Sequence, residues 1–176
     1  MVYEFKITSI EKPNFVRVIE MDGEYNFADF HWSIQKCCQY NSDQLASFFL
    51  ASDKWGKQTE ITFLDYGVTW NQTKIMGKTK LRDILFNTEQ RLLYIFDFFN
   101  DRSFYIELTE IHMEKNLQEN KVTYQQGDAP AQVLEEEAEG QQVTNSFELD
   151  DKYHDYGDLD DYTEIFGEME DLYEGD

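Results

Sequence analysis

Apolar residues in the first two-thirds of the chain alternate or recur in patterns typical of strands. Tyr3, Phe5 and Ile7 alternate with polar residues, and this period of two predicts a half-buried strand. A break at 12–14 precedes a second apolar run at 15–21, so the two runs predict a hairpin. Four further runs predict strands, the third of them apolar on both faces as in a covered strand: 45–52, 60–66, 92–99 and 104–111.

Two stretches have the pattern of helices. Asn26 followed by Asp29 resembles a capping box, and the apolar stripe behind it predicts an amphipathic helix over 27–39. Thr79 begins a second, shorter helix, and the polar stretch 67–78 between the two halves of the domain reads as a loop. The order β-β-α-β-β-α-β-β predicts an α+β fold, a largely antiparallel sheet with two helices packed against it.

Charge divides the chain after Val122. The 176 residues hold 15 Lys and Arg against 36 Asp and Glu, a net charge of −21. Residues 1–122 account for −4 of this charge and residues 123–176 for −17. The second segment repels itself and has little apolar surface, so we expect an acidic tail that is disordered when free. We predict a folded domain over 1–122 and a tail over 123–176 that begins with a linker at 127–131.

Aromatic residues are interleaved with the acids of this tail. One interpretation is a tail that only keeps the protein soluble. The other is a docking or regulatory peptide, in which the acids steer it to a basic protein partner and the aromatics anchor it. Mimicry of nucleic acid is a special case of the second interpretation. The docking residues would be Phe147, Tyr153, Tyr156, Tyr162, Phe166 and Tyr173.

Several classes of protein are disfavoured by what the sequence lacks. No apolar run approaches the roughly 18 residues that a membrane span needs, and the first residues do not resemble a secretion signal. The two cysteines are adjacent, so they cannot form a disulfide framework, and we expect a cytoplasmic protein. Glycine motifs for phosphate binding are absent and the three histidines are dispersed, so no cofactor or metal is expected. Cys37 and Cys38 are predicted as buried small hydrophobes, with a vicinal redox or metal pair as the alternative.

A few polar residues are candidates for a site. Asp97 interrupts an apolar strand, where an unpaired charge would be costly, and Arg102 across the following turn is its expected partner. Beside them is Asp101, and His31 lies at the edge of the predicted helix stripe next to Trp32. These residues either fix the turn and pack the helix, or line a ligand-binding or hydrolase pocket. The sequence assigns no catalytic residue, and it leans against an enzyme without excluding one.

Binding of duplex DNA is disfavoured, because sequence-independent affinity comes from cations that neutralise phosphates. An acidic body joined to a more acidic tail repels DNA. Only one local run is basic, and it is also a possible intramolecular site for the tail: Lys74, Lys78, Lys80 and Arg82.

Several segments together carry a family resemblance. In chain order they are Tyr3-Glu4-Phe5-Lys6-Ile7, Phe15-Val16-Arg17-Val18-Ile19, Phe27-Ala28-Asp29-Phe30-His31-Trp32-Ser33-Ile34, Asp43-Gln44-Leu45-Ala46-Ser47-Phe48-Phe49, Lys80-Leu81-Arg82-Asp83-Ile84-Leu85 and Leu93-Tyr94-Ile95-Phe96-Asp97-Phe98. They resemble the plasmid pRiA4b ORF-3-like family over roughly residues 2–112. The acidic, aromatic tail is similar to that of one bacterial branch of the family.

The resemblance adds two comparisons of residues. His31 matches the histidine of the family's first helix, and Phe96-Asp97-Phe98 matches the start of its Tyr-Asp-Phe-Gly-Asp pattern. Phe99 and Asn100 replace the family's glycine and second acid, Gln44 replaces a histidine, and a downstream Trp and His are absent. If this polar set forms a site in other members, the site is degraded here.

The resemblance implies no assigned activity. Some members are labelled as passengers of insertion elements, which implies proximity to mobile elements and no particular chemistry. Our leading hypothesis is a non-enzymatic protein-interaction module. The alternatives are an accessory protein in mobile-element DNA transactions, and a hydrolase or ligand-binding protein with a pocket near His31 and Asp97.

Overall fold

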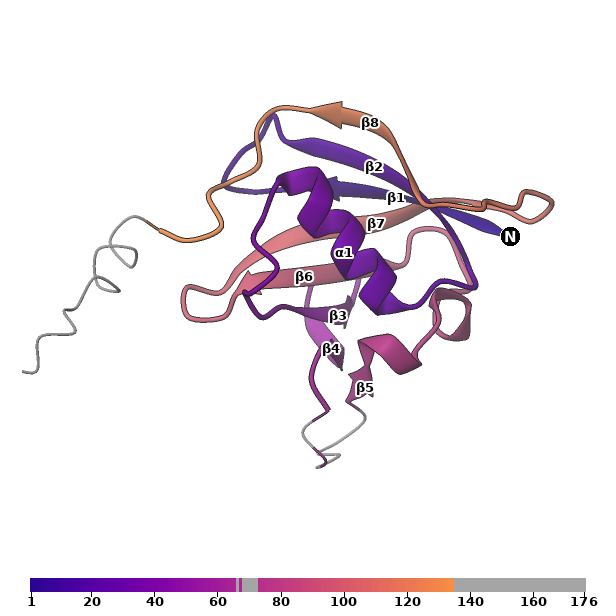
Figure 1. The fold of residues 1–176 in the computed structure, drawn as a ribbon, viewed down its shortest axis with the longest axis horizontal. Coiled ribbons are helices and arrows are strands. Elements are labelled where there is room, and N and C mark those ends of the chain that lie inside the picture. The colour runs from indigo at the N-terminus through magenta and orange to yellow at the C-terminus, as the bar shows by residue number, and fades with distance from the viewer. Residues whose placement is uncertain (66, 68–72, 135–176) are drawn as a thin grey trace, which may run out of the picture. The chain divides into compact units, whose positions relative to one another are not determined.

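The structure is a computed structural model that describes residues 1–65, 67 and 73–134 (Figure 1). It is mostly sheet, with one α-helix and two short 3-10 helices. The elements are β1 (Val2–Thr8), β2 (Val16–Asp22), α1 (Phe27–Cys38), β3 (Ser47–Ala51), β4 (Lys57–Thr62), β5 (Lys74–Ile75), η1 (Met76–Lys78), η2 (Leu81–Asp83), β6 (Arg91–Asp97), β7 (Arg102–His112) and β8 (Lys121–Gln126).

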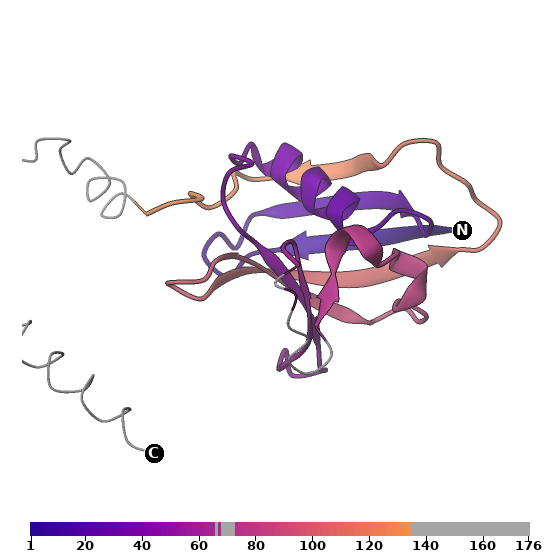
Figure 2. The same ribbon diagram turned by 60° about the horizontal axis from the view of Figure 1, so that its bottom comes forward.

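All eight strands join one sheet in the order β5-β4-β3-β6-β7-β1-β2-β8. Every neighbouring pair is antiparallel except β4 and β5, so the prediction of a largely antiparallel sheet is confirmed. The helix α1 lies along one face of this sheet (Figure 2). The predicted hairpin is β1 and β2, whose register pairs Val2 with Asp22 and Thr8 with Val16.

The helix α1 begins at the predicted cap. The side chain of Asn26 accepts a hydrogen bond from the backbone of Asp29, and the Asp29 carboxylate accepts one from the backbone of Asn26. Gln39 ends the helix in the left-handed conformation, which asparagine and glycine adopt more readily. No helix in the described part of the chain is long and apolar enough to cross a membrane.

The core between α1 and the sheet is rich in aromatic rings. Phe30 packs against both Phe5 and Phe48, with ring centroids 4.5 and 5.2 Å apart. The covered strand predicted at 92–99 is β6, in which five consecutive residues are buried. The largest fully buried side chains include Tyr3, Phe5, Phe15, Phe27, Phe30, Phe48, Tyr94 and Phe104.

The second predicted helix is wrong. The segment after Thr79 forms only the single turn η2, although Leu81 and Leu85 are buried as the pattern required. Its backbone hydrogen-bonds the chain that precedes α1: the Leu81 amide donates to Tyr25 O and the Arg82 amide to Gly23 O. These partners hold the segment beside the start of α1. The amides of Phe86 and Asn87, which a longer helix would use, donate to the side chain of Gln90. Likewise β5 and η1 lie in the predicted loop 67–78, and β4 begins three residues before the predicted strand.

The strand β8 crosses the boundary predicted after Val122. It pairs with β2 from Val16 with Gln126 to Glu20 with Lys121, and the compact unit extends from Met1 to Glu135. The first residues of the predicted tail therefore belong to the folded body. All residues of β8 are exposed, so the strand has no buried apolar positions from which the sequence could have predicted it. The six aromatic docking residues, Phe147, Tyr153, Tyr156, Tyr162, Phe166 and Tyr173, lie outside the described residues.

Candidate functional site

His31, a residue of α1, belongs to a buried polar group between the helix and β6. Its Nδ1 lies 2.8 Å from the hydroxyl of Tyr94, which also accepts a hydrogen bond from Gln35 Nε2 at 2.6 Å. Because Gln35 donates, the Tyr94 hydroxyl is free to donate to His31. Burial lowers the pKa of His31 to about 4, so the imidazole is neutral at pH 7. A neutral imidazole that is hydrogen-bonded to a buried tyrosine is typical of a histidine with a structural role.

Arg102 forms the ion pair that the sequence predicted with Asp97. Its Nη1 lies 3.4 Å from an Asp97 oxygen, and the guanidinium also makes a two-pronged contact with Glu11. Burial alone would raise the pKa of Asp97, but hydrogen bonds from Asn100 and Arg102 hold it below its usual range. Asp101 takes no part, since it is exposed and pairs with Lys57 at 2.5 Å.

The segment 127–134, which we call the tail root, connects these two groups. Arg102 donates to the carbonyl oxygens of Ala131 and Gln132. The side chain of Gln132 donates to Gln35 Oε1 at 3.5 Å and makes two hydrogen bonds with the backbone of Asn41. The tail root is therefore fastened to the body, in contrast to the flexible linker that its small residues and proline predicted.

Four surface pockets of the described residues have walls that include none of the predicted site residues His31, Asp97, Asp101 and Arg102. A series of hydrogen bonds through Tyr94, Gln35 and Gln132 joins His31 to Arg102. Asp101 lies outside this series. Sequence reasoning missed Tyr94, Gln35 and Gln132. Tyr94 carried a signal, as a polar hydroxyl in the most buried strand, which requires a partner.

An apolar patch lies on the surface above these hydrogen-bonded residues. Phe63 and Trp32 make an edge contact, with centroids 5.5 Å apart, and both pack on His31. Phe63 also lines a hollow of about 190 Å³ whose other walls include three large exposed side chains. Their exposed fractions are 52% for Leu45, 40% for Leu64 and 51% for Phe98, and Trp32 is 42% exposed. We define the apolar patch as Trp32, Leu45, Phe63, Leu64 and Phe98.

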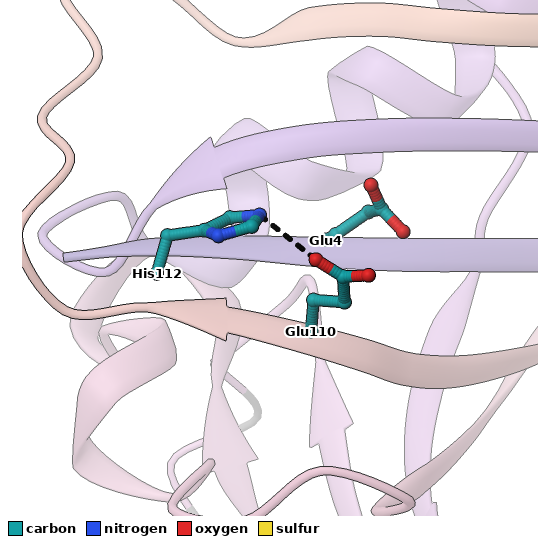
Figure 3. A group of neighbouring side chains, drawn as sticks. All are labelled: Glu4, Glu110 and His112. Atoms are coloured by element: carbon teal, nitrogen blue, oxygen red, sulfur yellow. Dashed lines mark ion pairs between the residues drawn. The ribbon is translucent and has the colours of Figure 1, made fainter.

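Three possible metal ligands gather on the other face of the sheet, where β1 meets β7 (Figure 3). A bulge at this point gives β7 an extra residue, so that Glu110 pairs with Glu4 while Leu108 pairs with Phe5. Glu110 lies 3.3 Å from His112, and Thr109 donates to Glu4 at 2.8 Å. Glu110 is largely exposed, and hydrogen bonds already occupy the group, so we assign no metal to it. Sequence spacing missed it because Glu4 is remote in the chain.

The basic run has little free charge. Lys78 pairs with Asp65, and both Lys80 and Arg82 pair with Glu24. Three of its four cations therefore have a carboxylate partner, which leaves a weak platform for phosphates.

In the described residues, a largely antiparallel sheet covered on one face by a single helix, with a buried series of polar side chains behind the helix, defines a small sheet-rich α+β protein. The chain belongs to the plasmid pRiA4b ORF-3-like family, whose model matches residues 1–170. This match confirms the resemblance and extends it beyond the folded body.

A solved structure and the curated proteins complete the comparison. The crystal structure of MM3350, a protein of unknown function from Methanosarcina mazei Go1, is similar with a TM-score of 0.55 and 22% identity over 70% of this chain and 68% of that one. At this identity the similarity concerns the fold alone. No curated protein matches the chain.

Proposed function

We propose that the protein is a non-enzymatic protein-interaction module that binds its partner at the apolar patch and uses the acidic tail as a second contact. The observation that carries the proposal is the patch itself. Its side chains are large and adjacent, and they surround a hollow. A contiguous exposed apolar surface of this kind marks an interaction site. Phe99, the residue after Phe98, adds a further ring that is almost wholly exposed.

The charge near the patch indicates the chemistry of the partner. Among the residues that the structure describes, Glu60 is the only charged one that lines the hollow, and the tail brings a large negative charge on the same chain. A partner segment with an apolar or aromatic anchor and basic flanks would match both features. Electrostatic attraction by the tail would mainly accelerate association, while the patch would set the lifetime of the complex.

The buried hydrogen-bond chain supports this arrangement. His31 packs beneath Trp32 and Phe63, and the same chain ends at Arg102 and the tail root. The residues that back the patch are thus also those that fasten the start of the tail. The polar set noticed in the sequence would position the binding surface without contacting a substrate.

The patch is tested with matched substitutions. A partner captured by the full chain from its host is purified, and its affinity is measured by fluorescence anisotropy against the wild type and the double variant L45S/F98S. We expect affinity to fall by about tenfold to a hundredfold, since central apolar anchors dominate binding energy. The control is the variant I10S/M113S, which removes two apolar side chains outside the patch, each of them 71% exposed.

The tail is tested with the chain ending at residue 134. We expect its loss to weaken binding at low salt and to have little effect at high salt, where the charges are screened. Unchanged affinity in the patch variant would refute docking at the patch. Unchanged affinity of the truncated chain at low salt would remove the tail from the proposal.

The alternative of a hydrolase or ligand-binding protein near His31 and Asp97 has less support. Both residues are occupied by structural partners, and the described pockets lie elsewhere. A role in mobile-element DNA transactions has less support for another reason, the pairing of Lys78, Lys80 and Arg82 with carboxylates.

A further inference from the structure

The last turn of α1 carries two adjacent cysteines in different environments. Cys38 is buried, whereas Cys37 is only half-buried, so the prediction of buried thiols holds for one of them. Their Sγ atoms are 3.9 Å apart, within the range of a thiol hydrogen bond. Cys37 lines two pockets of about 470 and 350 Å³, which also share Gln125.

Arg17 in the larger pocket is a buried cation without a carboxylate partner among the described residues. It is 7% exposed and occupies a core-facing position of β2. Its guanidinium donates to the carbonyl oxygens of Val16, Cys37 and Gln126 and stacks on the Phe15 ring. Carbonyl oxygens accept from three of its five N–H groups but leave its charge unneutralised. Because buried charges in proteins are usually paired, this one calls for an anion in the pocket.

The other charges facing Cys37 are mostly positive. Lys36 and Lys121 line the smaller pocket, and among the described residues Asp128 is the only carboxylate in either lining. The C-terminal end of α1 opposes a negative charge on Cys37. Arg17 offsets this effect, since its Nε donates to the Cys37 carbonyl at 3.4 Å.

We propose that Cys37 is a nucleophilic thiol that forms mixed disulfides with anionic, low-molecular-weight disulfides held beside Arg17. The Cys37 thiolate attacks one sulfur of the reagent, and a new sulfur–sulfur bond forms as the reagent's own bond breaks. The second sulfur of the reagent leaves as a thiolate and takes a proton from water. The Cys37 sulfur is oxidised and the departing sulfur is reduced, so no further oxidant is needed.

The two cysteines have separate roles in this reaction. Cys38 donates a hydrogen bond to the Cys37 thiolate, and this bond with the charge of Arg17 holds the pKa of Cys37 below its ordinary value, although burial opposes it. The same bond and burial raise the pKa of Cys38. Cys37 is therefore the attacking group, and Cys38 is a positioning residue that stays a thiol.

The test compares two disulfides of opposite charge on the native full-length chain. The probes are dithiobis(nitrobenzoate), a dianion, and cystamine, a dication. The ratio of their reaction rates is measured in the native chain and in the urea-unfolded chain. We expect the native ratio to favour the anion by about tenfold or more relative to the unfolded one, the low end of electrostatic focusing in a cleft. Mass spectrometry should locate one modification, on Cys37.

Variants separate the contributions. C37S should abolish the fast reaction, and C38A should slow it and move its pH midpoint upward, while C38S, which keeps a donor, should restore most of it. R17Q and the surface double variant K36Q/K121Q should each lower the preference for the anion, and the second keeps the test valid if the first does not fold. Equal charge ratios in native and unfolded chains, or modification of Cys38 in place of Cys37, would overturn the proposal.

Discussion

At the scale of single residues, the buried polar side chains have structural partners at the positions where the sequence left a structural role and a ligand site both open. His31 hydrogen-bonds the hydroxyl of Tyr94, and Arg102 pairs with both Asp97 and Glu11 while holding the tail root. A histidine buried as a neutral acceptor stabilises the fold only while it remains unprotonated. The free energy of unfolding should therefore depend on pH through the protonation of His31.

The variant H31Q should lose less stability in acid than the wild type. With a pKa of about 4 when folded against 6.5 when unfolded, His31 binds fewer protons in the native state, so its contribution is complete above pH 6.5 and declines as pH falls toward 4. The unfolding free energy that His31 contributes changes by about 3 kcal/mol over this pH interval. Urea unfolding at pH 7 and pH 4.5 measures it, because glutamine keeps an acceptor for Tyr94 without titrating.

The control for this prediction is H112Q, which removes a histidine that pairs with Glu110 at the surface. This variant controls for the loss of a histidine outside the buried polar group. Coincident profiles for the wild type and H31Q would contradict the assignment of His31 as a buried neutral histidine.

At the scale of elements, β8 and the tail root form one fastened unit. The strand adds to the sheet at β2, and the chain then turns at Gly127, where φ is +65°. Tyr40 donates to Pro130 O at 2.6 Å just beyond the turn. The close approach of Gly127 to the loop before β2 makes this turn specific for glycine.

Substitution G127A should destabilise the protein by about 1–3 kcal/mol. An added Cβ would lie 2.6 Å from the backbone oxygen of Asn14, which cannot move like a side chain, and the positive φ adds strain. Chemical denaturation measures the loss, and hydrogen exchange of β8 amides should quicken. The matched control is G77A, where a Cβ meets nothing within 4 Å; an equal cost at both positions would argue against the turn as the cause.

At the scale of the whole molecule, charge and fold change at different places in the chain. Composition changes after Val122, but the contacts of the body continue to residue 134. Most of the acidic charge lies beyond this point, since removing residues 135–176 reduces the net charge from −21 to −5. A boundary drawn on charge alone therefore cuts through the sheet.

Two truncations distinguish the boundaries. The chain ending at residue 134 should unfold within about 1 kcal/mol of the full chain at high salt, because it keeps β8 and the partners of Arg102 and Tyr40. The chain ending at residue 122 should be less stable by several kcal/mol, since it leaves buried donors without acceptors. Urea unfolding of the three chains measures both effects. Equal stability of the two truncated chains would show that the tail root contributes nothing to the fold.

Local sequence was sufficient where the partners are close along the chain. The capping box of α1, the hairpin of β1 and β2, and the pair of Asp97 with Arg102 all join residues within a short span, so residue order sets their geometry. Tertiary structure decided the features whose partners are remote. The carbonyl oxygens of Tyr25 and Gly23 accept hydrogen bonds from the segment of the expected second helix. Gln132 joins His31 to Arg102 through the buried hydrogen bonds. The apolar patch gathers side chains from α1, the ends of β3 and β4, and the turn after β6. Spacing along the chain carries no trace of such contacts, because they exist only once the sheet has brought the segments together.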